Sequence, residues 1–216
     1  MTISIVTGLP GFGKTLKLCE FGIRAMAAGK HVYANFPMWN FPDPKFNDLY
    51  HRYNDPIEVL SNPDIKNSLI LMSEVNILLS LRKMYQIPDH LWDDFRQHRK
   101  DGNNIMADAQ DMIDVAWMFK NLIQYQYHIY MKLALPKKRD FLNGRAFQLV
   151  RVKNPQPKGM DYGRRYWVYN PVYFNYYDTN FKLEKSKKHY DTAQEIIQSP
   201  WADYEREQYS RLLFTK

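Results

Sequence analysis

The stretch Gly8-Leu9-Pro10-Gly11-Phe12-Gly13-Lys14-Thr15 matches G-x-x-x-x-G-K-[ST] at every fixed position, a pattern typical of a phosphate-binding loop (P-loop). It follows an apolar run at residues 3–7 and opens a helical pattern at residues 14–28, the strand–loop–helix context that such a loop needs. Glycines let backbone N–H groups approach a phosphate, and the N-terminus of the following helix favours negative charge. We therefore expect nucleotide binding rather than a glycine-rich turn with a surface lysine.

The polar side chains of the loop have separate expected roles. Lys14 is predicted to reach the β- and γ-phosphates of ATP, and the Thr15 hydroxyl to ligate Mg²⁺. The residues predicted to bind the nucleotide are Gly8, Gly11, Phe12, Gly13, Lys14 and Thr15.

Short apolar or β-branched runs alternate with helical patterns through the first 135 residues. Strands are predicted at 3–7, 31–35, 68–72, 104–108 and 128–133, and helices at 14–28, 89–100 and 114–124. This alternation predicts an α/β fold, a three-layer P-loop NTPase with a mostly parallel sheet.

The composition and pattern of the sequence change after Pro136. Runs at 147–153 and 166–169 flank a proline- and glycine-rich turn and predict a basic β-hairpin, and helices are expected at 192–198 and 202–214. We expect a P-loop ATPase core at residues 1–135 and a basic, aromatic-rich extension at residues 136–216, packed together as one compact domain.

A second apolar run, residues 68–72, ends in Ser73 and Glu74. P-loop ATPases usually have Asp-Glu here, where Asp holds the magnesium shell and Glu polarises the attacking water. Ser73 can bond a water of the Mg²⁺ shell but brings no charge, so Ser73→Asp should raise the rate of hydrolysis. Glu74 is the predicted general base, and a solvent-facing glutamate after a strand is the alternative reading.

The run at residues 104–108 leads to Gln110. A glutamine at the end of a strand beside the P-loop strand would sense the γ-phosphate and help to position water. An ordinary loop glutamine is the alternative.

Taken in order along the chain, these motifs resemble the zonular occludens toxin (Zot) family, the assembly ATPases of filamentous phages, within the FtsK/HerA superclass of P-loop motors. Besides the P-loop and Ser73-Glu74, the resemblance rests on the stretches 31–35, 81–82, 87–88, 95–102, 109–110 and 176–179. The sequence departs from the family at Ser73, at Ala109, where the family has Thr, and in having no transmembrane helix after the ATPase domain. Its longest apolar run, residues 69–81, is interrupted by polar residues and is too short to span a bilayer.

The resemblance implies a homo-oligomeric ring, a pentamer or hexamer, in which an arginine of one subunit completes the site of the next. Arg99 is the first choice for this arginine finger, followed by Arg96 and Arg82. The implied function couples ATP hydrolysis to translocation of viral DNA, in genome packaging or in assembly and extrusion of filamentous phage. Capsid or membrane-associated viral proteins are the further implied partners, with the protein in the host cytoplasm or held by a partner at the virion or inner membrane. The alternative is a structural protein that binds nucleotide and hydrolyses it slowly or not at all.

The charge of the 216-residue chain, +7, is concentrated in one segment, because residues 132–165 carry 10 basic and 2 acidic side chains. This distribution excludes a general basic coat. Basic residues interleaved with aromatic rings suit single-stranded DNA; the alternatives are rings that form strand core and a patch that meets acidic lipid head groups. The predicted nucleic-acid residues are Lys137, Lys138, Arg139, Arg145, Arg151, Lys153, Arg164 and Arg165. The rings in and after this segment are Tyr162, Tyr166, Trp167, Tyr169, Tyr173, Phe174, Tyr176 and Tyr177.

Overall fold

The computed structural model describes residues 2–82, 89–97, 100–134, 146–156 and 158–177. The chain divides into two compact units, residues 1–181 and 182–216, and every described residue lies in the first. No helix within the described ranges is long and apolar enough to cross a membrane.

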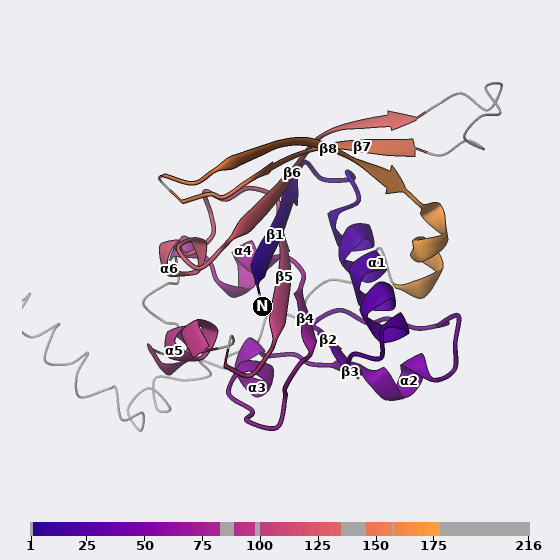
Figure 1. Ribbon diagram of the computed structural model, residues 1–216, viewed down its shortest axis with the longest axis vertical. Coiled ribbons are helices and arrows are strands. Elements are labelled where there is room, and N and C mark those ends of the chain that lie inside the picture. Colours follow the sequence, from indigo (N-terminus) through magenta and orange to yellow (C-terminus); the bar gives the residue numbers. More distant parts are fainter. Residues whose placement is uncertain (1, 83–88, 98–99, 135–145, 157, 178–216) are drawn as a thin grey trace, which may run out of the picture. The chain divides into compact units, whose positions relative to one another are not determined.

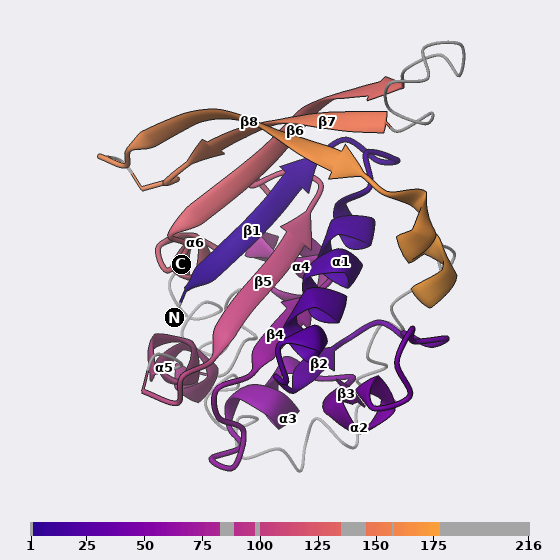
Figure 2. The same cartoon turned by 45° about the vertical axis from the view of Figure 1, so that its right-hand side comes forward.

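An eight-stranded sheet in the order β3-β2-β4-β5-β1-β6-β7-β8 forms the centre of the first unit (Figures 1 and 2). Its strands are β1 (Ile3–Gly8), β2 (Val32–Ala34), β3 (Tyr50–Arg52), β4 (Leu69–Met72), β5 (Asn104–Ala109), β6 (Tyr125–Ala134), β7 (Ala146–Lys153) and β8 (Asp161–Tyr169). The first six strands pair in parallel, and β7 and β8 are antiparallel to their neighbours. Because parallel strands end at one edge of a sheet, the loops that follow β1, β4 and β5 lie together at that edge, where open α/β sheets bind ligands.

Helices cover both faces of the sheet, so the predicted three-layer α/β architecture is confirmed. They are α1 (Lys14–Ala27), α2 (Phe46–Leu49), α3 (Pro56–Leu60), α4 (Val75–Leu78), α5 (Asp89–Gln97), α6 (Trp117–Lys120) and the 3₁₀ helix η3 (Pro171–Tyr176). The alternation of side chains along each strand divides the core into two clusters. Leu71 of β4 packs with α1 on one face, and its neighbours Ile70 and Met72 pack with α5 and α6 on the other.

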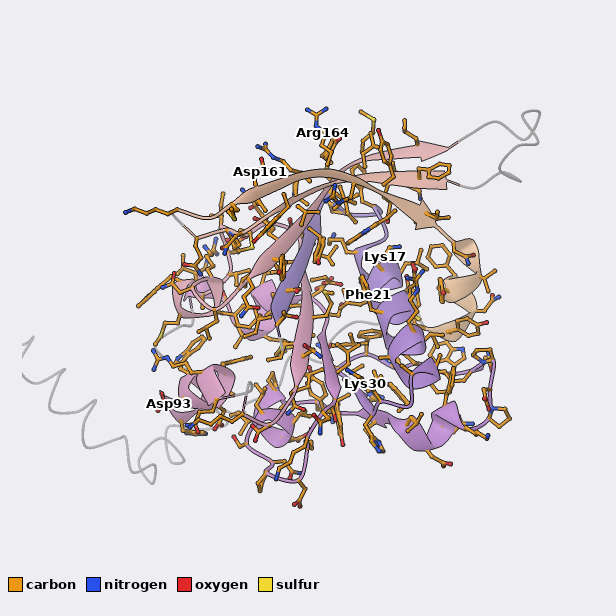
Figure 3. All side chains as sticks on the ribbon, in the orientation of Figure 1. Lys17, Phe21, Lys30, Asp93, Asp161 and Arg164 are labelled. Atoms are coloured by element: carbon orange, nitrogen blue, oxygen red, sulfur yellow. The ribbon has the colours of Figure 1, made fainter. Side chains whose placement is uncertain are left out.

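The hairpin β7–β8 continues the core sheet, since β7 pairs with β6 from Gln126↔Lys153 to Ala134↔Ala146. One face of the hairpin packs against α1. Trp167 of β8 lies there, with its ring 5.0 Å from the Lys17 ammonium and 6.0 Å from the Phe21 ring. Figure 3 shows Lys17 and Phe21 on α1, below the hairpin. We use "outer face" for the opposite side of β7 and β8, which carries Arg151, Arg164 and Tyr166.

The predicted helix at 114–124 is wrong for most of its length, because only Trp117–Lys120 is helical. The apolar spacing correctly marked Val115 and Phe119 as buried. However, the chain before α6 forms its hydrogen bonds with another segment: Leu81 N–H donates to the Asp114 carbonyl at 2.8 Å, and Ala116 N–H to the Leu79 carbonyl at 2.8 Å. These bonds hold residues 114–116 out of a helix.

Other boundaries differ by less. The last strand begins at Asp161 rather than residue 166, because it pairs with the whole of β7. The helix predicted at 89–100 is found as α5, Asp89–Gln97. The helices predicted at 192–198 and 202–214 lie outside the described residues.

Candidate nucleotide-binding and catalytic site

The P-loop joins the end of β1 to the start of α1 and takes its shape from its glycines. Gly8, Gly11 and Gly13 have φ values of 148°, 76° and 79°, which residues with a side chain rarely adopt. A Cβ on Gly8 would lie 2.6 Å from the Ile129 carbonyl oxygen, and one on Gly13 would lie 2.6 Å from the ring of Tyr169. Both positions therefore require glycine because of close packing from β6 and β8.

The Lys14 ammonium lies over the loop, where it donates to the carbonyls of Gly8 at 2.9 Å and Leu9 at 3.2 Å. Burial lowers the pKa of Lys14, and the carboxylates of Asp108 and Glu74 oppose that shift. The group that would clamp a phosphate thus lies between the loop and two acidic side chains.

A cavity of about 300 Å³ opens beside the P-loop. Its lining comes from the loop, from the ends of β4 and β5, and from β8 and the segment after it. The lining residues are Pro10, Gly11, Gly13, Lys14, Thr15, Glu74, Asp108, Gln110, Tyr169, Phe174 and Tyr177. The structure therefore brings the predicted phosphate clamp, metal ligand, general base and γ-phosphate sensor to one cavity, although these residues are spread along the sequence from Lys14 to Gln110.

Asp108 on β5 is the acidic residue of this cavity that sequence reasoning missed. Its side chain is fully buried, and its Oδ2 accepts a hydrogen bond from Thr15 Oγ1 at 2.9 Å and from Ser73 Oγ at 3.3 Å. Burial raises the pKa of Asp108, against the effect of its hydrogen bonds from Glu74 N–H and Thr15 and of the Lys14 charge. The available signal was an aspartate within the otherwise apolar run at residues 105–109.

The turn Ser73-Glu74 is fixed from both neighbouring strands. The Asn35 side chain, just after β2, accepts from Ser73 N–H at 2.7 Å and donates to the Ser73 carbonyl at 2.9 Å. On the other side, Glu74 N–H donates to Asp108 Oδ1 at 2.7 Å. Glu74 adopts φ 51° and ψ 50°, in the left-handed region, and its half-buried side chain lines the cavity.

Gln110 follows β5, which pairs directly with the P-loop strand β1. The carbonyl of Gln110 accepts a hydrogen bond from Gly8 N–H at 3.3 Å, and its exposed side chain lines the cavity. Gln110 therefore lies at the cavity beside the P-loop, and its role as a γ-phosphate sensor stays a prediction.

The predicted arginine fingers are not at this cavity in the described part of the chain. Arg99 lies outside the described residues. Arg96 is exposed and pairs with Asp93 at 2.9 Å, and Arg82 is exposed after α4. A residue that acts on the next subunit of a ring need not lie at its own cavity, so these predictions stay open to test.

The predicted nucleic-acid residues divide into several groups. Those between β6 and β7 lie outside the described residues, namely Lys137, Lys138, Arg139 and Arg145. Arg151 and Arg164 are paired across β7 and β8 on the outer face, whereas Arg165 is paired with buried Val150 and belongs to the opposite face. Lys153 is exposed at the end of β7, and Arg151 forms an ion pair with Asp161, with an Nε–Oδ2 distance of 2.9 Å.

The rings of the extension belong mainly to the core, so the stacking interpretation is wrong for most of them. Tyr169 and Tyr177 are buried, and four others pack against the α1 side of the core: Trp167, Tyr173, Phe174 and Tyr176. Tyr166, which is 74% exposed, and Tyr162, which is 39% exposed, remain available for stacking.

Comparison with known proteins finds a similar fold among solved structures. No protein-family model matches the sequence, and no curated protein matches it. Among solved structures, the fold is similar to the N-terminal domain of zonular occludens toxin from Neisseria meningitidis, with a TM-score of 0.53 and 18% identity over 82% of this chain and 98% of that chain. The DNA-packaging ATPase from Sulfolobus Turreted Icosahedral Virus gives a TM-score of 0.49 and 9% identity over 79% of this chain and 97% of that chain. The chain thus has the P-loop NTPase fold, in an arrangement similar to the Zot N-terminal domain.

Proposed function

We propose that this protein is a viral P-loop ATPase that couples hydrolysis of ATP to translocation of DNA in virion assembly, for genome packaging or for extrusion of a filamentous phage. One observation carries the proposal: Lys14 and Thr15 at the start of α1, Glu74 after β4 and Gln110 after β5 line a single cavity beside the P-loop. The likeness of the fold to the Zot domain supports the same reading.

The side chains of the cavity divide the chemistry between them. The backbone N–H groups of the loop would surround the phosphates and Lys14 would clamp them, which fixes the γ-phosphate for attack. Gln110 would orient the attacking water, and Glu74 would accept its proton. An arginine of the next subunit, Arg99 by preference, would stabilise the charge that develops on the γ-phosphate.

The residues present fit Mg²⁺ as the cofactor of ATP. The Thr15 and Ser73 hydroxyls and the Asp108 carboxylate lie within hydrogen-bonding distance of one another, and oxygen donors are what this ion prefers. Thr15 would hold the ion, with Ser73 acting through a bound water. When bound with the nucleotide, Mg²⁺ supplies positive charge that neutralises the phosphate oxygens.

DNA would bind the outer face of the hairpin. Arg151 and Arg164 lie there side by side, and Tyr166 is exposed on the same face. Cations for phosphates and a ring for a base favour single-stranded DNA. A ring of subunits acting with capsid or membrane-associated viral proteins is the proposed assembly, in the host cytoplasm or at the virion or inner membrane.

The alternative is a structural protein that binds nucleotide without turnover, and the absence of Asp at position 73 and of Thr at position 109 favours it. An ATPase assay with and without single- and double-stranded DNA separates the two. We expect hydrolysis that DNA stimulates and that Lys14→Ala and Glu74→Gln each abolish. Nucleotide binding without hydrolysis in the wild-type protein would support the structural alternative.

A further inference from the structure

We propose that Asp108 supplies the carboxylate of the Mg²⁺ site, in place of the aspartate that P-loop ATPases usually carry at the position of Ser73. The inference rests on the proposed function and concerns the same cavity. The acidic group would come from β5, the strand between the P-loop strand and β4, instead of from β4 itself.

Strand register places Asp108 next to the position of the missing charge. In the parallel pair β4–β5, Leu71 is opposite Met106 and Met72 is opposite Ala107, so Ser73 and Asp108 follow as the next neighbours. Their side chains meet, because Ser73 Oγ donates to Asp108 Oδ2 at 3.3 Å. Adjacent strands are about 4.8 Å apart, so side chains at neighbouring positions on one face of the sheet can contact each other.

The two oxygens of the Asp108 carboxylate have different partners. Oδ1 accepts from Glu74 N–H at 2.7 Å, which fixes the turn that carries the general base. Oδ2 accepts from Thr15 Oγ1 at 2.9 Å, and Thr15 is the side chain that a P-loop directs at the metal. A carboxylate whose only role was to support the turn would not need a hydrogen bond from the Thr15 hydroxyl.

The surroundings of Asp108 also favour a cation. Its side chain is fully buried, and none of the ion pairs among the described residues includes it. The nearby Lys14 ammonium donates to two loop carbonyls. A buried carboxylate with neutral hydrogen-bond donors pays a desolvation cost that a bound cation would offset.

The same geometry explains the serine at position 73. Aspartates at both 73 and 108 would put two carboxylates against each other in a buried site, which disfavours both charges. A serine hydroxyl instead donates a hydrogen bond to Asp108. Ser73→Asp alone should therefore weaken Mg²⁺ binding and not raise the rate of hydrolysis, contrary to the expectation from the sequence.

The test measures the affinity of the protein for a fluorescent ATP analogue in excess Mg²⁺ and in EDTA. In the wild-type protein Mg²⁺ should tighten binding. In Asp108→Asn this gain should fall by on the order of tenfold or more, as for lost partners of other metal sites, while the affinity in EDTA should not fall, because the variant removes a negative charge beside the phosphates. Asp111→Asn, just after the same strand, is the matched control and should retain the full gain.

The double variant Ser73→Asp/Asp108→Ser moves the carboxylate to the usual strand and should restore the gain, even if Asp108→Asn proves too unstable to assay. Electron paramagnetic resonance, which measures Mn²⁺ bound together with nucleotide, should show weaker Mn²⁺ binding in Asp108→Asn than in the wild-type protein, Asp111→Asn or the double variant. A full Mg²⁺ gain in Asp108→Asn, or no gain in a folded double variant, would overturn the role of Asp108 and leave the proposed function standing. A wild-type protein that binds no nucleotide in either buffer would instead overturn the proposed function and the inference with it.

Discussion

Glu74 holds a left-handed backbone conformation, φ 51° and ψ 50°, that is unfavourable for any residue with a Cβ. Strain of this kind persists where the surrounding structure imposes it, and it gathers at functional sites. Here the neighbours that impose it are Asn35 on one side and Asp108 on the other. The glutamate is thus retained at a place where glycine would be the more stable residue.

Comparing Glu74→Gly with Glu74→Ala isolates that strain, because both variants lose the carboxylate. We expect Glu74→Gly to be more stable than Glu74→Ala by about 1 kcal/mol, since glycine adopts the left-handed conformation without penalty. Urea unfolding measures the difference, and neither variant should hydrolyse ATP. Equal stabilities would show that the backbone at position 74 is not strained.

Asn35 makes a matched pair of hydrogen bonds with the backbone of Ser73, which is buried. Asn35→Ala would leave a buried N–H and a buried carbonyl without these bonds, which costs about 1–3 kcal/mol for each group. We expect a loss of stability in urea unfolding together with slower ATP hydrolysis, because the turn that carries Glu74 is released. Asn47→Ala, an exposed asparagine on α2, is the control and should change neither property.

At the scale of elements, η3 covers α1 where Cys19 is buried. The Cys19 thiol lies 3.7 Å from the Tyr173 carbonyl, and burial raises the pKa of Cys19 to about 12. Only the thiolate reacts with disulfide reagents, so at pH 8 labelling of the native protein should be slower than that of the unfolded chain by on the order of a thousandfold. Asn170→Ala removes the side chain that caps η3 through Val172 N–H and should speed labelling.

The direction of the pH effect follows from the raised pKa. The unfolded chain loses the Cys19 proton near the ordinary value of 9.0, whereas the folded protein keeps it to about 12. The contribution of the Cys19 thiol to the free energy of unfolding is therefore fully present below about pH 9 and is lost as the pH rises toward 12. Cys19→Ser should be unreactive at every pH, and rapid labelling of the native wild-type protein at pH 8 would contradict the burial of Cys19 beneath η3.

Elements were predictable from the sequence where local pattern decides them. The strand, loop and helix at residues 3–28 carry their own signals, so β1 and α1 lie where they were expected. The helix expected at 114–124 failed because periodicity reports burial and not hydrogen-bond partners, and the backbone of that stretch pairs with Leu79 and Leu81. The local sequence pattern does not predict backbone hydrogen bonds between segments as far apart as Leu79 and Ala116.

At the scale of the whole molecule, the same distinction separates the parts of the site. The P-loop, Glu74 and Gln110 each follow a strand, so the order of the motifs was enough to bring them to one edge of a parallel sheet. Asp108 could not be assigned in this way, because its contacts with Thr15 and Ser73 depend on the order and register of β4, β5 and β1. The core position of Trp167 depends likewise on the packing of β8 against α1.

The two faces of the hairpin allow a final prediction about DNA. Arg164 lies on the outer face and its neighbour Arg165 on the opposite face, so the two residues have the same charge and are both exposed but differ in orientation. We expect Arg164→Gln to weaken binding of single-stranded DNA and to reduce the slope of log K against log salt by about 0.7, the value for one phosphate contact. Arg165→Gln should leave the slope unchanged. Fluorescence anisotropy with a labelled oligonucleotide measures both slopes, and equal losses in the two variants would mean that DNA does not distinguish the faces, so that only the net charge of the segment attracts it.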